Sequence, residues 1–257
     1  MTDVEVVVAA YIASAWRRPD TVVFDTPDWF ENRTPSSLFG NHNSVRRCRL
    51  DPRACELRIR ATQEHHRETG ADIRWTVTPS CRPAELGELL LAAGFQRSWA
   101  TAGMLRATEP LEGVPGDVKV STVGAEDAER FAKVCGAAWS LPDDFMASIA
   151  SDMVRYIRSG WMIYVIASID GDDVGSSHVL LAPGSGYLMG GGVRPDARGR
   201  GVYRAMVDYR LALLRARDVE EASVVALEDT SAPILAGLGF RRVCGFQDYT
   251  WKPQFST

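Results

Sequence analysis

The second half of the chain alternates between helical and strand-like spacing of apolar residues. Its longest stretch, Val202–Arg217, places apolar residues on one helical face and its arginines, Arg210 among them, mostly off that face. Similar spacing predicts helices over Ala125–Ala138, Asp144–Ile157 and Ala232–Leu238. Apolar runs predict strands over Met162–Ile169, Val174–Leu181, Tyr187–Val193, Ser223–Leu227 and Arg241–Trp251, the last as one strand or a pair. The Asp170-Gly171 step is typical of a tight hairpin.

The first half shows a similar alternation. It predicts helices over Asp3–Arg17, Pro52–Glu68 and Pro83–Ala93, and strands over Thr21–Phe24, Ser44–Arg49, Ile73–Val77 and Phe95–Leu105. Between the halves, Ala107–Asp117 contains two prolines and two glycines and has no apolar period. We therefore expect two domains, residues 1–107 and 118–257, joined by a linker over residues 108–117.

The composition is that of an ordinary globular protein. With 257 residues, 46% hydrophobic and 24% charged, the chain can bury a sizeable core. The formal net charge of -4 lacks the basic surplus usual in nucleic-acid binders. The apolar stretch Val4–Trp16 carries Glu5 and is too short to span a bilayer, and the five cysteines form no CxxC pair. We therefore expect a cytoplasmic protein without nucleic-acid, membrane or metal partners.

One short segment occurs twice in similar form. Leu89–Phe95 resembles Ile234–Phe240, and each follows one predicted strand and precedes another. The repeat suggests two copies of one fold. A generic connection, in which glycine ends a helix before the next strand, explains it equally well, so the sequence leaves both interpretations open.

The segment Arg198–Tyr203 has the features of an anion-binding helix start. Gly199 and Gly201 precede the long predicted helix and allow both a sharp turn and a close approach of ligand to the main chain. The first N–H groups of a helix lack partners within it, and the helix dipole favours negative charge there. Arg198 and Arg200 add permanent positive charge in a geometry suited to phosphate.

Two common phosphate-binding motifs do not fit this segment. The chain has no Gly-Lys-Ser/Thr of a nucleoside-triphosphate loop, and Arg204 stands where a dinucleotide fingerprint would need its third glycine. The segment instead resembles the signature of the GNAT superfamily of acyl-CoA N-acyltransferases. Arg198, Gly201 and the lead-in from Val193 to Pro195 match that signature, whereas Tyr203 fills its last small position.

The resemblance covers roughly Val118–Trp251 and implies both a fold and an activity. The implied fold is α/β (α+β), with a mixed, mostly antiparallel twisted sheet flanked by helices, in two tandem units. The first unit would be a degenerate copy, because Leu50-Asp51-Pro52-Arg53 stands where a glycine-rich loop would be. The implied activity is acetyl transfer from acetyl-CoA, or transfer from another acyl-CoA, to an amine without a covalent enzyme intermediate.

The resemblance also implies where the cofactor lies. Its pyrophosphate would bind the amides of Gly199–Arg204, and its pantetheine would pair with the strand edge at Gly191–Val193. Thr230 and Ser231 would cap the last helix and contact the pantetheine. The expected cofactor residues are Gly191, Gly192, Val193, Arg198, Gly199, Arg200, Gly201, Val202, Tyr203, Arg204, Thr230 and Ser231.

The catalytic groups usual in the family are missing. Leu235 occupies the position of its acidic tyrosine, and Glu228 replaces a familiar asparagine. Glu228 is a candidate base acting through one water, or else a solvated carboxylate at a strand end. His178 is a candidate that titrates near neutrality, or else a core histidine. Tyr203 is a candidate acid, or else packs at the helix start.

The acceptor side is implied by the connection between the first two helices of the second unit. Trp139, Asp143, Asp144 and Phe145 lie there, and the acids suit a cationic amine or simply an ordinary helix start. We expect a small-molecule amine acceptor and a monomer or homodimer. The sequence leaves open a non-catalytic acyl-CoA-binding module, another acyl group and an oxygen acceptor.

Overall fold

Contacts within the chain divide it into two compact units, and each unit combines segments that lie far apart in the sequence. The computed structural model describes residues 1–253, without the side chains of Asp143 and Asp144. One unit holds Met1–Met104, Val225–Ala236 and the chain from Arg241 onward, and the other holds Leu105–Val224 and Gly237–Phe240. These units are defined by contacts in space. The expected domains, residues 1–107 and 118–257, divide the chain along its sequence, and that division stays a prediction.

The first unit is completed by the last strand of the chain. Its helices are α1 (Asp3–Ala13), α2 (Pro52–Thr69), α3 (Leu86–Ala92) and α7 (Ser231–Ala236). Its strands follow the order β1 (Val22–Asp25), β2 (Trp29–Arg33), β3 (Ser44–Cys48), β4 (Ile73–Val77), β11 (Arg241–Trp251) and β5 (Gln96–Ala107). β11 pairs antiparallel with β4, with Tyr249 opposite Trp75. The segment predicted as one strand or two is a single strand.

The two faces of the first unit's sheet differ in chemistry, because alternate residues of a strand point to opposite faces. Val45 and Trp75 belong to an apolar core beneath α2 and α3. Their neighbours Arg46 and Thr76 bond α1 instead: the Thr76 hydroxyl lies 2.6 Å from that of Tyr11, and Arg46 donates to the Tyr11 carbonyl at 2.7 Å. α1 is thus joined to the sheet by buried polar contacts.

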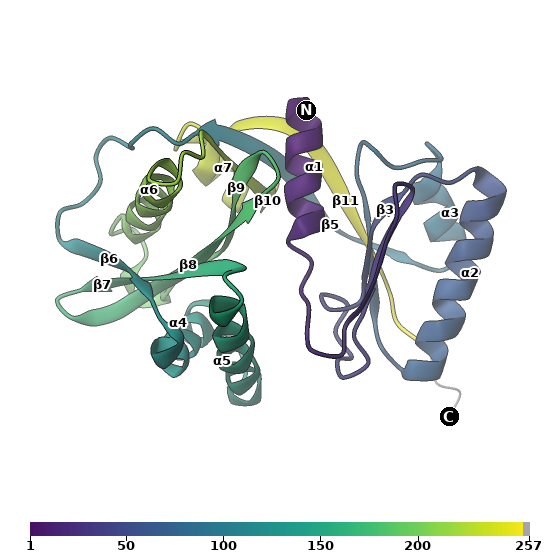
Figure 1. The fold of residues 1–257 in the computed structure, drawn as a ribbon, viewed down its shortest axis with the longest axis horizontal. Coiled ribbons are helices and arrows are strands. Elements are labelled where there is room, and N and C mark those ends of the chain that lie inside the picture. Colours follow the sequence, from purple (N-terminus) through teal and green to yellow (C-terminus); the bar gives the residue numbers. More distant parts are fainter. Residues whose placement is uncertain (254–257) are drawn as a thin grey trace. The chain divides into compact units, whose positions relative to one another are not determined.

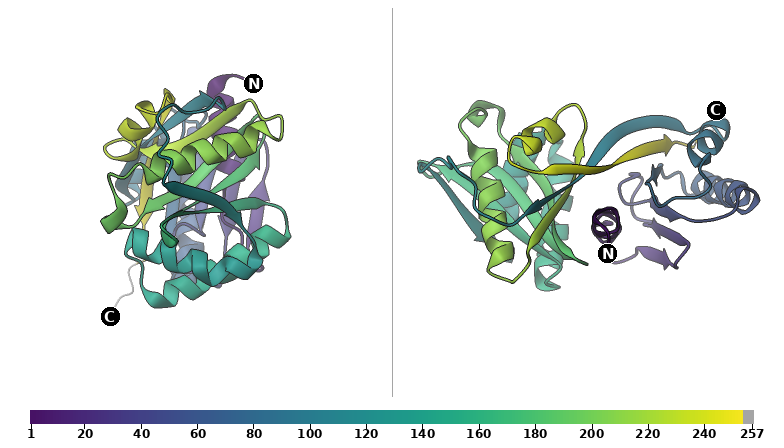
Figure 2. Two further views of the ribbon diagram at one scale, coloured as in Figure 1. Left: turned by 90° about the vertical axis from the view of Figure 1, so that its left-hand side faces the viewer. Right: turned by 90° about the horizontal axis from the view of Figure 1, so that it is seen from above.

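The second unit is a sheet between two layers of helices. Its strands follow the order β10 (Glu221–Leu227), β9 (Ser185–Val193), β8 (Asp172–Ala182), β7 (Met162–Ile169) and β6 (Val118–Val123). Figures 1 and 2 show α6 (Val202–Arg215) on one face and the pair α4 (Ala128–Trp139) and α5 (Asp143–Arg158) on the other. Among the described pairings, β3 with β4 and β9 with β10 are parallel. The expected mixed, mostly antiparallel sheet flanked by helices is confirmed.

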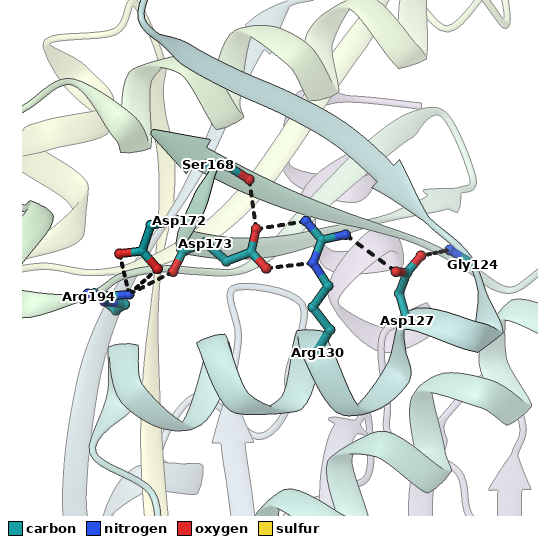
Figure 3. A network of polar contacts seen from close by, with 7 residues as sticks. All are labelled: Gly124, Asp127, Arg130, Ser168, Asp172, Asp173 and Arg194. Carbon is teal, nitrogen blue, oxygen red and sulfur yellow. Dashed lines mark hydrogen bonds and ion pairs between the residues drawn. The ribbon is translucent and has the colours of Figure 1, made fainter. Parts of the chain in front are cut away.

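A network of ion pairs fixes the β7–β8 hairpin (Figure 3). Asp170 and Gly171 both have positive φ, 51° and 84°, as the Asp-Gly turn predicts. Just beyond the turn, Arg130 of α4 donates to both carboxylate oxygens of Asp173, at 2.5 and 2.7 Å. Arg194 binds Asp172 at 2.9 Å. The network therefore connects α4, the hairpin and the end of β9, directly before the glycine-containing loop.

The segment predicted as a linker lies along α6. The Leu111 N–H donates to the Asp208 carboxylate at 2.7 Å, and Arg204 donates to the Glu112 carbonyl at 2.8 Å. Pro115 lies so close to Gly201 that a β-carbon there would overlap its ring. By its contacts, residues 108–117 form part of the second unit.

Candidate functional site

α6 begins with an N-terminus that no side chain caps. Gly199 and Gly201 both have left-handed φ values, 79° and 75°. Gly201 is the N-cap and has no side chain to accept from the first helical N–H groups. The start of α2 is different, because the Asp51 carboxylate accepts from the Ala54 N–H at 2.8 Å. Of the two helix starts compared in the sequence, the one in the second unit is suited to an external anion.

The arginines around this loop hold it in place. Arg198 donates to the Val193 carbonyl at 3.3 Å and to the Ala138 carbonyl at 3.4 Å, which connects the end of β9 to the end of α4. Arg200 lies 3.5 Å from Asp117, with both side chains about half exposed at 49% and 58%. Such an exposed pair is weak. A bound phosphate can therefore displace Asp117 at little cost.

One edge of β9 is open beyond Tyr187. In the described chain, the parallel ladder to β10 joins only Gly186 with Ala222 and Tyr187 with Ser223. On its other edge, β9 stays paired to β8 as far as Val193. The main chain from Leu188 to Val193 therefore presents one unpaired edge, which includes the Gly191–Val193 edge expected to pair with pantetheine.

Gly190 and Gly191, near the end of β9, form a bulge. Ser176 pairs with Gly192 and His178 with Met189, so one residue of β8 faces Gly190 and Gly191 of β9. Gly190 adopts a φ of 55°, in the left-handed region. Bulges are frequent beside active sites because they redirect main-chain groups.

Side chains from three other elements occupy the space beside these glycines. A β-carbon on Gly190 would overlap the His178 ring. One on Gly191 would lie 2.7 Å from Cε2 of Tyr203, and one on Gly192 would lie 2.5 Å from Nε1 of Trp139. The structure thus brings Tyr203 and Trp139, both named from the sequence, against the expected cofactor edge.

His178 lies in the interior of the second unit. The side chain is buried in β8 and stacks on Tyr164, with ring centroids 5.2 Å apart. Burial, reinforced by the Arg210 charge, lowers the pKa of His178 to about 3. The imidazole is therefore neutral near pH 7 and a weak base.

Tyr203 contacts an arginine that the sequence pattern placed off the helix's apolar face. Arg210 is only 1% exposed, and its guanidinium and the Tyr203 ring both lie beside Gly191. Burial raises the pKa of Tyr203 and lowers that of Arg210 to about 10. The sequence spacing does indicate burial of Arg210, because it lies four residues from both Met206 and Leu214, which are buried.

The candidates at the end of β10 belong by their contacts to the first unit. Glu228 accepts a hydrogen bond from Arg242 at 2.6 Å. The Ser231 hydroxyl accepts from the Leu227 N–H at 2.9 Å, and the Thr230 N–H lies 3.4 Å from the Leu227 carbonyl. Roles for Glu228, Thr230 and Ser231 in catalysis or cofactor binding stay predictions.

The residues expected on the acceptor side lie at the α4–α5 connection. Trp139 is 51% exposed and ends α4. The Phe145 N–H donates to the Pro142 carbonyl at 3.1 Å in the first turn of α5. The Asp143 and Asp144 side chains lie outside the described residues. Within the described part, no three His, Cys, Asp or Glu residues group as a metal site would need, and no helix has the length and apolarity to cross a membrane.

Comparison with known proteins finds similarity in structure alone. No family model and no curated protein matches the sequence. A GCN5-related N-acetyltransferase from Kribbella flavida is 17% identical, with a TM-score of 0.71 over 96% of each chain. A tandem GNAT protein from the clavulanic acid biosynthesis pathway is 18% identical, with a TM-score of 0.63 over 97% of this chain and 89% of that one.

The chain has the tandem GNAT fold. A functionally unknown conserved protein from Staphylococcus epidermidis ATCC 12228 shares it at 14% identity, with a TM-score of 0.71 over 92% of this chain and 96% of that one. The GNAT fold in tandem agrees with the repeated segment: α3 and α7 each lead through a left-handed glycine, Gly94 and Gly239, into a strand. At these identities the likeness establishes the fold, and function rests on the site.

Proposed function

We propose that the protein is an acyl-CoA-dependent N-acyltransferase, which moves an acetyl group from acetyl-CoA to the amine of a small molecule. The observation that carries this proposal is the uncapped start of α6 in the same unit as the open edge of β9. The first suits a pyrophosphate, and the second suits an extended amide-containing arm. The proposal agrees with the named activity of the Kribbella flavida protein that shares the fold.

In the proposed reaction the amine attacks the thioester carbon directly. A C–N bond forms, negative charge collects on the carbonyl oxygen, and collapse breaks the C–S bond to release the thiolate. Main-chain N–H groups at the Gly190-Gly191 bulge are the proposed donors to that oxygen. The proton lost by the amine passes to a base or to solvent, and the thiolate takes up a proton.

Glu228 is the proposed base, acting through a water molecule. Its Oε1 accepts a hydrogen bond from Arg242 at 2.6 Å. Glu228→Gln should lower kcat about 10- to 100-fold, within the range for general bases, and leave acetyl-CoA affinity unchanged. Asp229→Asn, at the exposed neighbouring position, is the matched control. Normal turnover by Glu228→Gln would remove Glu228 from the mechanism.

A second candidate is an acyl-CoA-binding module without catalysis. Three observations favour it: Leu235 is buried where the resemblance places an acid, His178 has a pKa of about 3, and burial raises the pKa of Tyr203. In this case the site would bind the cofactor and release no thiol.

One experiment separates these candidates. The protein is incubated with acetyl-CoA and a panel of amines, polyamines, amino acids and aminoglycosides, while free thiol and thermal stability are followed. Thiol release that depends on one acceptor supports the transferase. Stabilisation by acetyl-CoA without thiol release from any acceptor favours the binding module. No stabilisation by acetyl-CoA or by longer acyl-CoA compounds excludes both.

A further inference from the structure

A buried cation lies beneath the bulge of β9. The Arg210 side chain is fixed to its own helix by a bond from Nε to the Met206 carbonyl at 3.0 Å. Its Nη1 donates to two strand carbonyls, those of His178 in β8 and Met189 in β9, both at 3.3 Å. These two residues are the register pair directly beside the bulge. One guanidinium therefore binds both strands where their pairing shifts.

The charge of this arginine is costly to bury, and an ordinary core residue would avoid that cost. Its guanidinium donates to the carbonyls of Met206, His178 and Met189. Burial lowers the pKa of Arg210 to about 10, which still leaves it charged at pH 7. A buried cation that bonds carbonyls of one helix and two strands indicates a role beyond filling space.

The contact with Met189 determines the direction of the next amide. In a trans peptide the C=O of one residue and the N–H of the next point in opposite directions. Arg210 reaches the Met189 carbonyl from α6, so the Gly190 N–H points away from α6. Trp139, which the sequence analysis expected on the acceptor side, belongs to α4, and α4 lies on the other face of this sheet (Figure 1). The positive charge also polarises this peptide and strengthens its N–H as a donor.

We propose that Arg210 is a positioning residue for acyl transfer: it holds the Met189–Gly190 peptide so that the Gly190 N–H donates to the thioester oxygen as that oxygen becomes negative. This inference rests on the proposed transferase function. It assigns to a helix residue that touches no substrate the orientation of the main-chain donor. Removing Arg210 should then affect the chemical step and spare cofactor binding.

The test compares Arg210→Met with the wild type and with Arg217→Met. Arg217 follows the end of α6, is exposed and bonds the Leu213 carbonyl, so its loss should change nothing. For each protein, infrared spectroscopy measures the carbonyl stretch of bound [1-¹³C]acetyl-CoA, and kinetics measure kcat and the KM for acetyl-CoA. We expect a stretch below that of free acetyl-CoA in the wild type, and a return towards the free value in Arg210→Met. We also expect kcat to fall about 10- to 100-fold, with KM within about threefold, as partial loss of one oxyanion donor predicts.

Arg210→Lys covers the case in which Arg210→Met does not fold. An ammonium keeps the charge but lacks the planar fork that bonds two carbonyls, so its stretch and kcat should be intermediate. An unchanged stretch and kcat in either folded variant would overturn the positioning role. So would a parallel loss of kcat and cofactor affinity with an unchanged stretch, since that is a general structural effect. Failure of the wild type to bind acetyl-CoA at all would instead refute the proposed function, and the inference with it.

Discussion

Replacing Gly201 by alanine adds a methyl group at a crowded position with a left-handed backbone. The φ of 75° costs a non-glycine residue about 1–2 kcal/mol. The new β-carbon would also overlap Cγ of Pro115, and relieving such an overlap costs about 1–3 kcal/mol. We therefore expect Gly201→Ala to lower the free energy of unfolding by about 2–5 kcal/mol.

Gly199 provides a matched control in the same loop. Its φ of 79° is nearly the same, but nothing lies within 4 Å of a β-carbon there. Gly199→Ala should therefore cost the backbone strain alone, about 1–2 kcal/mol. Urea unfolding followed by circular dichroism measures both variants, and the difference between them isolates the overlap with Pro115.

A double variant tests the assigned cause. Pro115→Ala combined with Gly201→Ala removes the overlapping ring atoms and should recover the overlap cost of about 1–3 kcal/mol relative to the sum of the single changes. Equal destabilisation by Gly199→Ala and Gly201→Ala would refute the steric argument. Strict additivity of Pro115→Ala and Gly201→Ala would refute the contact itself.

Three further predictions concern charge and hydrogen bonding in the second unit. The pKa of His178, about 3 in the folded state, lies below the value near 6.5 of an unfolded histidine, so the unfolded state takes up the proton first. As the pH drops from about 6.5 towards the folded pKa, the free energy of unfolding should therefore decrease by up to about 1.4 kcal/mol per pH unit. In His178→Asn, urea unfolding at several pH values should show a weaker dependence of this free energy on pH. The Arg130 guanidinium lowers the pKa of Asp173, so this pair stabilises the fold above the unfolded pKa of about 4 and loses that effect as pH falls through the folded value. Asp173→Asn should lower the free energy of unfolding by about 1 kcal/mol at pH 7 and by almost nothing in acid. The Asp172 carboxylate is 64% exposed, so Asp172→Asn should lower it by less at pH 7. Equal losses at pH 7 would contradict the assignment. Tyr203→Phe keeps the ring against Gly191 and removes only the hydroxyl, so calorimetry should show acetyl-CoA affinity within about twofold of the wild type. A large loss of affinity would show that the hydroxyl serves the ligand.

The sequence predicted elements best where apolar residues follow one clear period. The strands Ile73–Val77 and Met162–Ile169 have the expected ends, and the helices differ by a few residues at their ends. β2 was not predicted, because its buried residues include Glu31 and Asn32, and polar side chains give no apolar pattern. β6 was also missed, although Val118, Val120 and Val123 give it a partial alternation directly after the proline-glycine segment.

Pairings between distant segments were outside the reach of local patterns. The strand over Arg241–Trp251 was predicted from its own apolar residues, and its partner β4 lies more than 160 positions earlier in the chain. Each segment looks like an ordinary strand by itself, and the choice of partner depends on the register of the whole sheet. Arg210 illustrates the same limit at the level of one residue. Its charge argues for exposure, whereas its spacing from Met206 and Leu214 argues for burial, and the carbonyls that compensate the charge lie on β8 and β9.

The glycines 190–192 show how far local reasoning reaches in the site itself. From sequence, the run of three glycines indicated an unobstructed edge for a cofactor, or else a bulge or a weak strand end. The structure has both the bulge and the open edge. The register between β9 and β8 shifts at the glycines, and the ladder between β9 and β10 has already ended at Tyr187. The absent side chains are replaced by the rings of His178, Tyr203 and Trp139, which come from β8, α6 and α4. The glycines therefore mark a point where three elements converge on one main-chain segment. Glycine identifies where a close approach occurs, and only the fold identifies which side chains make it.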